Sequence, residues 1–160
     1  MKNIERIHKY IKESGINPDG HKSKRAKLYG IDMMGGLEPF VELIGENGDV
    51  YELLSDYSNA ANCGEFTKFA ITTCGWAAPL SEDDTYDDSV RPSEHPKRRR
   101  VMLVSMYDGG KLYSAIDFED SDEYVYDDSG RGELADAMMQ FAAISQAMKI
   151  VKKTMEGHNE

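Results

Sequence analysis

The sequence has few cysteines and no long apolar run. It contains two cysteines, Cys63 and Cys74, in 160 residues. They are too few for a zinc site, and a domain of this size does not need a disulfide. No stretch approaches the ~20 apolar residues that cross a bilayer, and the charged N-terminus lacks the apolar region of a secretory signal. We therefore expect a cytoplasmic protein with no membrane contact.

The charge is acidic overall but unevenly distributed. The net charge is −10, yet residues 1–27 carry eight Lys and Arg against three Asp and Glu, which gives +5. The remaining residues carry eleven against twenty-six, which gives −15. An excess of negative charge repels phosphate backbones, so nucleic acid is an unlikely partner and a protein partner is expected.

The motifs that usually carry catalysis or bind cofactors are missing. The chain has no G-x-G-x-x-G or G-x-x-x-x-G-K-[ST] phosphate loop and no G-x-S-x-G nucleophile elbow. An EF-hand starting at Asp117 would need glycine at its sixth position, where Asp122 stands. The histidines are scattered without metal-ligand spacing, at His8, His21, His95 and His158. The sequence therefore predicts no cofactor, no metal and no catalytic residue.

Periodicity and turn residues predict helices at both ends and strands between them. Apolar residues at helical spacing predict a first helix over about 2–14 and a long last helix over about 134–155. Asn47-Gly48 between two apolar runs is a hairpin signal, and Asp108-Gly109-Gly110 is another turn. The expected strands are 28–34, 40–44, 50–54, 66–74, 101–107 and 112–118.

Strand follows strand without crossover helices, so we expect an antiparallel sheet. The predicted fold class is α+β, with a sheet of five or six strands flanked by the N- and C-terminal helices, profilin-like in outline. The strand 101–107 is apolar on both faces and should be central. Residues 1–160 are expected to form a single domain with a long charged loop at 81–100.

The segment 75–100 holds the candidate binding residues. It contains the only tryptophan and a basic run that follows an acidic block at 82–88. The ordinary interpretation is a core tryptophan and charges that neutralise each other within one loop. The functional interpretation is a site for an anion or an acidic partner, reinforced by Lys22, Lys24, Arg25 and Lys27 if the fold brings them close. The predicted binding residues are Trp76, His95, Lys97, Arg98, Arg99 and Arg100.

A resemblance to a family includes the same region of the chain. The segments Gly75-Trp76-Ala77-Ala78-Pro79, Pro92 to Val101 and Gly132 to Ala137 resemble small uncharacterised proteins of actinobacteria and their bacteriophages. The similarity covers residues 73–137. It implies a genomic setting, that of a phage accessory protein or a small regulator, and it carries no activity or ligand.

Three functions remain open from the sequence. The leading hypothesis is a non-enzymatic protein-binding or regulatory module, for example a phage accessory protein that acts on a host protein. The second is a hydrolytic enzyme that uses Asp117 or Asp120 with His95 and an arginine of the loop. The third is a nucleic-acid mimic, since −15 on residues 28–160 could imitate a phosphate strand.

Overall fold

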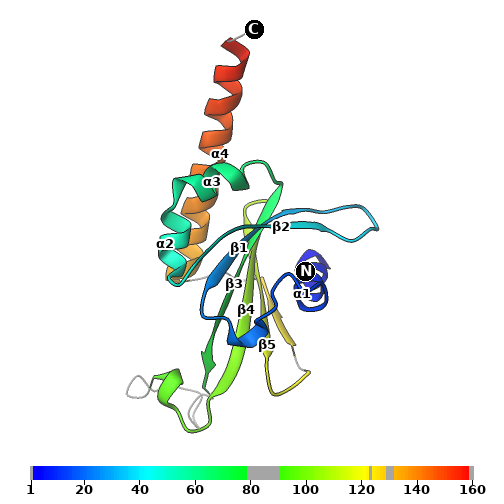
Figure 1. Ribbon diagram of the computed structural model, residues 1–160, viewed down its shortest axis with the longest axis vertical. Helices are drawn as coiled ribbons and strands as arrows, with labels where there is room; N and C mark the ends of the chain where they lie inside the picture. Colours follow the sequence, from blue (N-terminus) through cyan, green and yellow to red (C-terminus); the bar gives the residue numbers. More distant parts are fainter. Residues whose placement is uncertain (1, 79–90, 123, 129–131, 159–160) are drawn as a thin grey trace.

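The strands of the described residues form one antiparallel sheet, as predicted. The computed structural model describes residues 2–78, 91–122, 124–128 and 132–158 (Figure 1). Within them the sheet has six strands in the order β2-β1-β3-β4-β5-β6. The strands are β1 Ala26–Asp32, β2 Phe40–Asn47, β3 Lys68–Ala77, β4 Arg99–Asp108, β5 Lys111–Phe118 and β6 Tyr124–Asp127.

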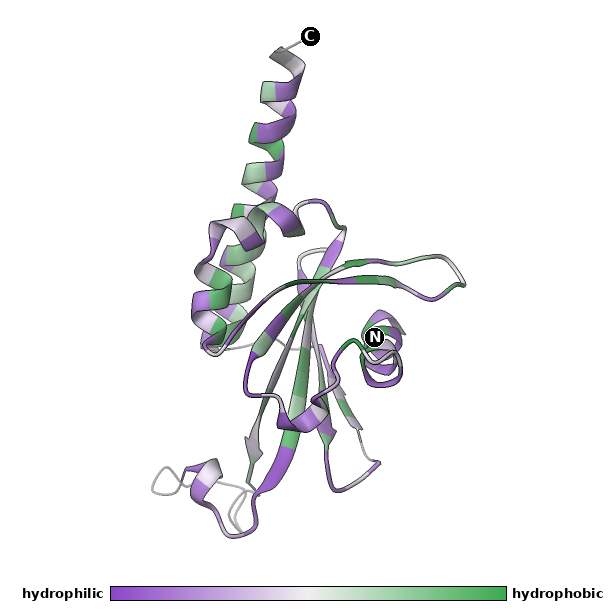
Figure 2. Cartoon of the chain, viewed as in Figure 1, coloured by the Kyte–Doolittle hydropathy of each residue, from purple (hydrophilic) through white to green (hydrophobic). Residues whose placement is uncertain are grey.

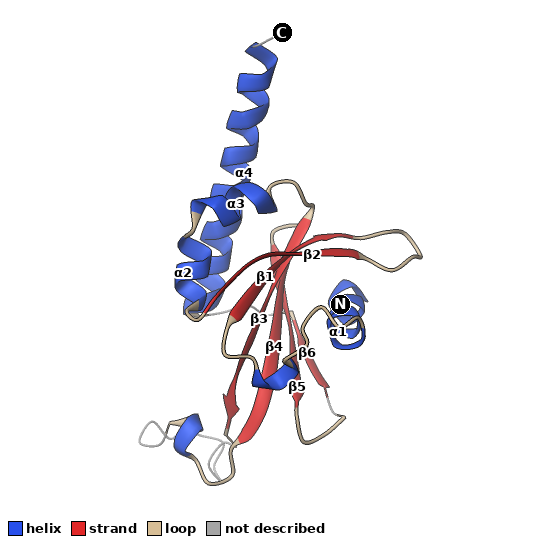
Figure 3. Cartoon of the chain, viewed as in Figure 1, coloured by secondary structure: helices blue, strands red, loops and turns tan. Residues whose placement is uncertain are grey.

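Helices lie on both faces of the sheet. On one face lies α1, Lys2–Glu13. The opposite face carries α2, Val50–Ser55, α3, Tyr57–Cys63, and α4, Glu133–His158 (Figure 3). Two short 3-10 turns complete the order, η1 at Gly20–Lys22 and η2 at Pro92–Glu94. The predicted α+β class is thus confirmed, and none of the described helices is long and apolar enough to span a membrane.

The core under α1 follows from helical spacing. Ile4, Ile7 and Ile11 form one stripe of the helix and are fully or almost fully buried. They pack on the inward residues of the strands, among which are Tyr29, Ile31, Val104 and Met106. Burying each large aliphatic side chain contributes roughly 1.5–3 kcal/mol. This stripe therefore fixes which side of α1 faces the sheet.

The core under α4 is almost entirely apolar. Met138, Phe141 and Ala142 of α4 pack on Phe69 and Ile71 of β3, together with side chains of α2 and α3. The rings of Phe69 and Phe141 meet edge to face with centroids 5.1 Å apart. Burial also raises the pKa of Cys63 to about 12, so this thiol is inert at neutral pH.

The predicted strand at 50–54 is wrong, because these residues form α2. Asp49 caps the helix: its carboxylate accepts hydrogen bonds from the backbone N–H groups of Tyr51 and Glu52. A short apolar run has no periodicity that separates a strand from a helix, so the cap decides. The hairpin partner of β2 is β1, on the other side of the 33–39 connection.

The expectation that only the terminal helices cover the sheet is also wrong. The additional helix α3 begins after Asp56, whose carboxylate accepts a hydrogen bond from the Ser58 N–H. Together α2 and α3 pack against α4 on the same face. The predicted loop 81–100 lies in part outside the described residues, whereas its end, Arg99 and Arg100, belongs to β4.

The register of the central strands places the polar residues of the α1 face in adjacent rows. Cys74 of β3 lies opposite Met102 of β4, which lies opposite Asp117 of β5. The next row pairs Trp76 with Arg100. Because residues two apart on a strand share a face, these two rows are neighbours on the α1 side.

The close packing of Gly30 in β1 gives a test of the fold. A Cβ at this position would overlap the ring of Phe66, whereas a Cβ at Gly75 in β3 would meet nothing. We predict that Gly30→Ala lowers the free energy of unfolding by about 2 kcal/mol, since overpacking costs about 1–3 kcal/mol. Gly75→Ala should change it by less than about 0.5 kcal/mol. Urea denaturation measures both, and equal stability of the two variants would contradict the packing described.

Candidate functional site

A buried carboxylate lies at the centre of the α1 face. The Asp117 side chain has no solvent exposure and receives hydrogen bonds on both oxygens. His8 Nε2 lies 2.7 Å from Oδ2, His21 Nε2 lies 2.7 Å from Oδ1, and Lys12 Nζ lies 3.1 Å from Oδ2. An ionised carboxylate only accepts hydrogen bonds, so both imidazoles carry a proton on Nε2.

Two tyrosines of the edge strand β6 complete this cluster. The Tyr126 hydroxyl lies 2.9 Å from His8 Nδ1, the acceptor nitrogen of that ring, so the hydroxyl donates. Lys12 Nζ donates to the Tyr124 hydroxyl at 2.9 Å and also lies over the Tyr124 ring, 4.4 Å from its centroid. The cluster therefore joins α1, η1, β5 and β6.

The electrostatics of the cluster favour an ionised Asp117 and a neutral His8. Burial lowers the pKa of His8, and the hydrogen bond and charge of Asp117 offset this only in part. Burial alone would raise the pKa of Asp117, but hydrogen bonds from His8, His21 and Lys12 together hold it below its usual value. For Lys12 burial is likewise outweighed, by Tyr124 and Asp117, and its pKa is raised. The buried carboxylate is thus neutralised by an ammonium group that remains partly exposed.

The segment before β1 is fastened to the same face by further polar contacts. The Cys74 Sγ–H donates to the Gly20 carbonyl at 3.1 Å. Lys27, itself buried, donates to the Asn17 side-chain oxygen at 2.8 Å, and the Asn17 amide lies 3.2 Å from the Met102 sulfur. Together with His21 on Asp117, these contacts hold residues 17–21 on the row Cys74–Met102–Asp117.

A second cluster lies beside the first, at the end of β3 and β4. The half-buried Trp76 ring has the Arg100 guanidinium 4.4 Å and the Arg98 guanidinium 4.8 Å from its centroid. Arg100 also forms an ion pair of 3.7 Å with Glu119. We call Trp76, Arg98 and Arg100 the Arg–Trp platform; the start of β4 beside it is hydrophilic (Figure 2).

The remaining predicted binding residues lie elsewhere. Arg99 points to the opposite side of the sheet from Arg100, where it binds Asp120 at 2.6 Å and lies over the Phe118 ring. The His95 ring accepts a hydrogen bond from the backbone N–H of Lys97, whose side chain is exposed. The structure thus brings together three of the six predicted residues. Of the hydrolytic set, the described contacts contain Asp120 with Arg99, but they join neither Asp117 nor Asp120 to His95, and Asp117 binds His8 and His21 instead.

The sequence did not predict the Asp117 cluster, because Asp117 was considered as a calcium ligand or as the acid of a hydrolytic site. Two signals could have indicated it. Asp117 keeps the inward phase of β5, two residues after the buried Ala115. His8 is adjacent to Ile7 and four residues from Ile4, on the apolar side of α1. Polar residues at apolar phases mark buried polar networks.

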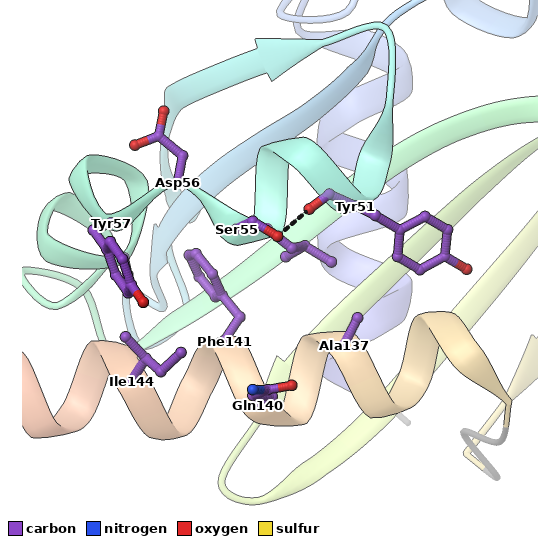
Figure 4. Close-up of a pocket in the computed structure, with 10 residues that line it drawn as sticks. Tyr51, Ser55, Asp56, Tyr57, Ala137, Gln140, Phe141 and Ile144 are labelled. Atoms are coloured by element: carbon purple, nitrogen blue, oxygen red, sulfur yellow. Dashed lines mark hydrogen bonds between the residues drawn. The ribbon is translucent and has the colours of Figure 1, made fainter.

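A cavity on the other face of the sheet offers fewer groups that could bind a ligand or take part in catalysis. About 180 Å³ lies between α2, α3 and α4 (Figure 4). It is lined by Tyr51, Tyr57, Phe141 and Ile144, and its one carboxylate, Asp56, caps α3. Ser55 Oγ donates to the Tyr51 carbonyl at 2.7 Å. These groups are committed to holding the helices, so we place the candidate site on the α1 face.

Comparisons with known proteins add no further constraint. No protein-family model, no curated protein and no solved structure matches the chain. Among the described residues, no group of three or more His, Cys, Asp and Glu side chains is arranged to hold a metal ion. Function is therefore argued from the two clusters alone.

The shifted groups make the stability of the protein sensitive to acid. An unfolded His8 binds a proton near pH 6.5 and the folded one, with its lower pKa, does not, so the free energy of unfolding should fall below about pH 6.5. Asp117, whose folded pKa is also lowered, adds a second loss below about pH 4. Urea midpoints from pH 8 to 3.5 measure this. His8→Asn should weaken the first decline and His95→Asn should not; a flat profile from pH 7 to 4.5 would refute the assignment.

Asp117 itself should be essential to stability. We predict that Asp117→Asn lowers the free energy of unfolding by about 3 kcal/mol, because an amide in place of the fully buried carboxylate leaves donors of the cluster without an acceptor. The matched control is Asp120→Asn, whose carboxylate is exposed and paired with Arg99, and which should lose much less stability than Asp117→Asn. Similar losses in the two variants would show that the buried cluster contributes no more than a surface pair.

Proposed function

We propose that the protein is a non-enzymatic binding module that recognises an acidic segment of a protein partner through the Arg–Trp platform. The observation that carries the proposal is the position of two guanidinium groups over one indole ring. Stacking on the ring holds the planar groups in place. Arg98 donates one N–H to the His95 carbonyl and Arg100 Nε pairs with Glu119, and the other N–H groups of the two side chains can bind an anion.

The chemistry of the platform favours carboxylates as its ligands. Guanidinium groups bind carboxylates through paired hydrogen bonds. The Trp76 ring already carries two cations, so it offers less stacking surface to a nucleobase. Lys97 adds an exposed positive charge next to Arg98 in the chain. The platform therefore suits an acidic peptide better than single-stranded nucleic acid.

The charge of the whole chain supports a protein partner. At −10 the chain repels nucleic acid over distances longer than a contact, while a local acidic segment of a protein carries fewer charges. The resemblance to small actinobacterial and phage proteins suggests the setting, in which the partner is a host protein and the module regulates it. That setting is part of the proposal.

Neutralising the platform should weaken binding of an acidic peptide. A fluorescein-labelled dodecamer of glutamate, titrated by fluorescence polarisation, is the probe. We predict that Arg98→Gln combined with Arg100→Gln raises the dissociation constant about tenfold, which corresponds to about 1.4 kcal/mol. Trp76→Leu should raise it about threefold, since it removes a cation–π support worth about 0.5–1 kcal/mol.

The control for this experiment is Lys111→Gln, which removes an exposed cation at the start of β5. It lowers the net charge by the same unit as each arginine change, and we expect no more than a twofold effect. The proposal would be contradicted if the platform variants bound the glutamate peptide with the same dissociation constant as the wild type. Tighter binding of the wild type to a DNA dodecamer than to the glutamate peptide would also contradict it.

A further inference from the structure

We infer that the acidic partner is an extended segment that contacts two basic patches, the Arg–Trp platform and the turn Lys22–Arg25, and that His21 and Asp117 position this turn beside the platform. We call residues 22–25 the basic turn. The inference rests on the proposed function and extends it to a second surface, to the length of the partner and to two positioning residues.

Cys74 connects the segment that leads into the basic turn with the strand that carries Trp76. The Gly20 carbonyl accepts the Cys74 Sγ–H at 3.1 Å, directly before His21 in the chain. Burial raises the pKa of Cys74, whereas the Ser23 backbone and the charges of Lys27 and Arg100 lower it. Trp76 follows Cys74 by two residues on the same face of β3. The turn η1 also contacts β3 and β4 (Figure 1).

The basic turn has cations to offer. The side chains of Lys22 and Lys24 are exposed, and among the described residues neither ammonium group has a hydrogen-bond or ion-pair partner. Arg25 is exposed and holds a long ion pair of 3.8 Å with Glu46. Lys27, in contrast, is buried on Asn17 and does not belong to the surface. The surface therefore gains Lys22 and Lys24 as its free charges.

His21 and Asp117 act as positioning residues. The Asp117 carboxylate is held from three sides and cannot follow a moving loop, so its 2.7 Å contact with His21 Nε2 fixes the residue next to Lys22. The groups that face His21 and its carboxylate are His8 and Lys12 of α1 and Tyr124 of β6. A buried hydrogen-bonded carboxylate is a rigid reference point, because moving it would expose its desolvated partners.

Two basic patches suit a segment with several acids in succession. One lies at the ends of β3 and β4, and the other lies at a turn that follows η1, which packs against these strands. A single anion can satisfy one guanidinium pair, whereas a longer acidic segment can bind the platform and the basic turn at once. The second attachment then takes place at high effective concentration and strengthens binding. A glutamate dodecamer should accordingly bind at least tenfold more tightly than a glutamate trimer.

A double-mutant cycle tests the positioning role. With the glutamate dodecamer as probe, Lys22→Gln combined with Lys24→Gln should weaken binding about tenfold, and His21→Asn alone about fivefold. If His21 acts by placing the two lysines, His21→Asn should cost less than twofold when they are already neutral. Equal losses in both backgrounds would overturn the inference. Lys111→Gln, which lies at the start of β5 and outside both patches, should change affinity less than twofold.

Further measurements separate the possible failures. Hydrogen exchange of amides 20–25 should accelerate at least tenfold in His21→Asn, while the urea midpoint reports any global loss of stability. If the wild type does not bind the dodecamer, the proposed function fails, and exchange still tests the positioning role. Unchanged exchange in His21→Asn overturns that role. A different outcome is that the wild type forms dimers whose population rises with concentration and which Arg98→Gln and Lys22→Gln abolish. In that case the partner is a second copy of the chain, and the proposed acidic partner is overturned.

Discussion

The buried carboxylate of Asp117 is the constraint on which the α1 side of the molecule depends. An uncompensated charge in the interior would cost several kcal/mol, so its partners must be in place whenever the fold is formed. Those partners come from α1, from the turn at η1 and, through the tyrosines, from β6. One side chain thus specifies where the N-terminal helix sits, how the segment before β1 runs, and how the sheet edge is covered.

The two faces of the sheet are stabilised by different physics. Under α2, α3 and α4 the core is apolar. Its stability depends on the apolar area that is buried, so such a core tolerates substitutions that conserve volume. Under α1 the isoleucine stripe shares the interface with the hydrogen bonds of the buried Asp117 carboxylate, which also pairs with the partly exposed Lys12. Hydrogen bonds depend on direction as well as distance, so the polar groups of this face can be satisfied in only one arrangement. A site that must present charges in a fixed arrangement is better placed there.

The candidate site joins these two properties. The Arg–Trp platform lies one row beyond Asp117 on the same face, at the end of β3 and the start of β4. Stacking on Trp76 orders two guanidinium groups, and the Asp117 cluster orders the chain leading into the basic turn. The rigid polar interior thereby supports an exposed basic surface on a protein whose overall charge is −10. Local order, and not the mean charge, determines what such a surface can bind.

Local patterns in the sequence determined the elements, and the tertiary structure decided their roles. Helical spacing predicted α1 and α4, and apolar runs on either side of a glycine turn predicted β4 and β5, because each signal lies within a few residues. The run at 50–54 was ambiguous by itself, and the cap at Asp49 resolved it as a helix. Trp76 and the arginine run were visible in the sequence, but the register decided that Arg100 joins Trp76 while Arg99 faces away. The partners of Asp117 lie 96 and 109 residues away in the chain, and no local pattern encodes a contact at that separation. Only the packed sheet, which must satisfy every polar group it buries, could turn an acid from an apparent surface loop into the fixed centre of the α1 face.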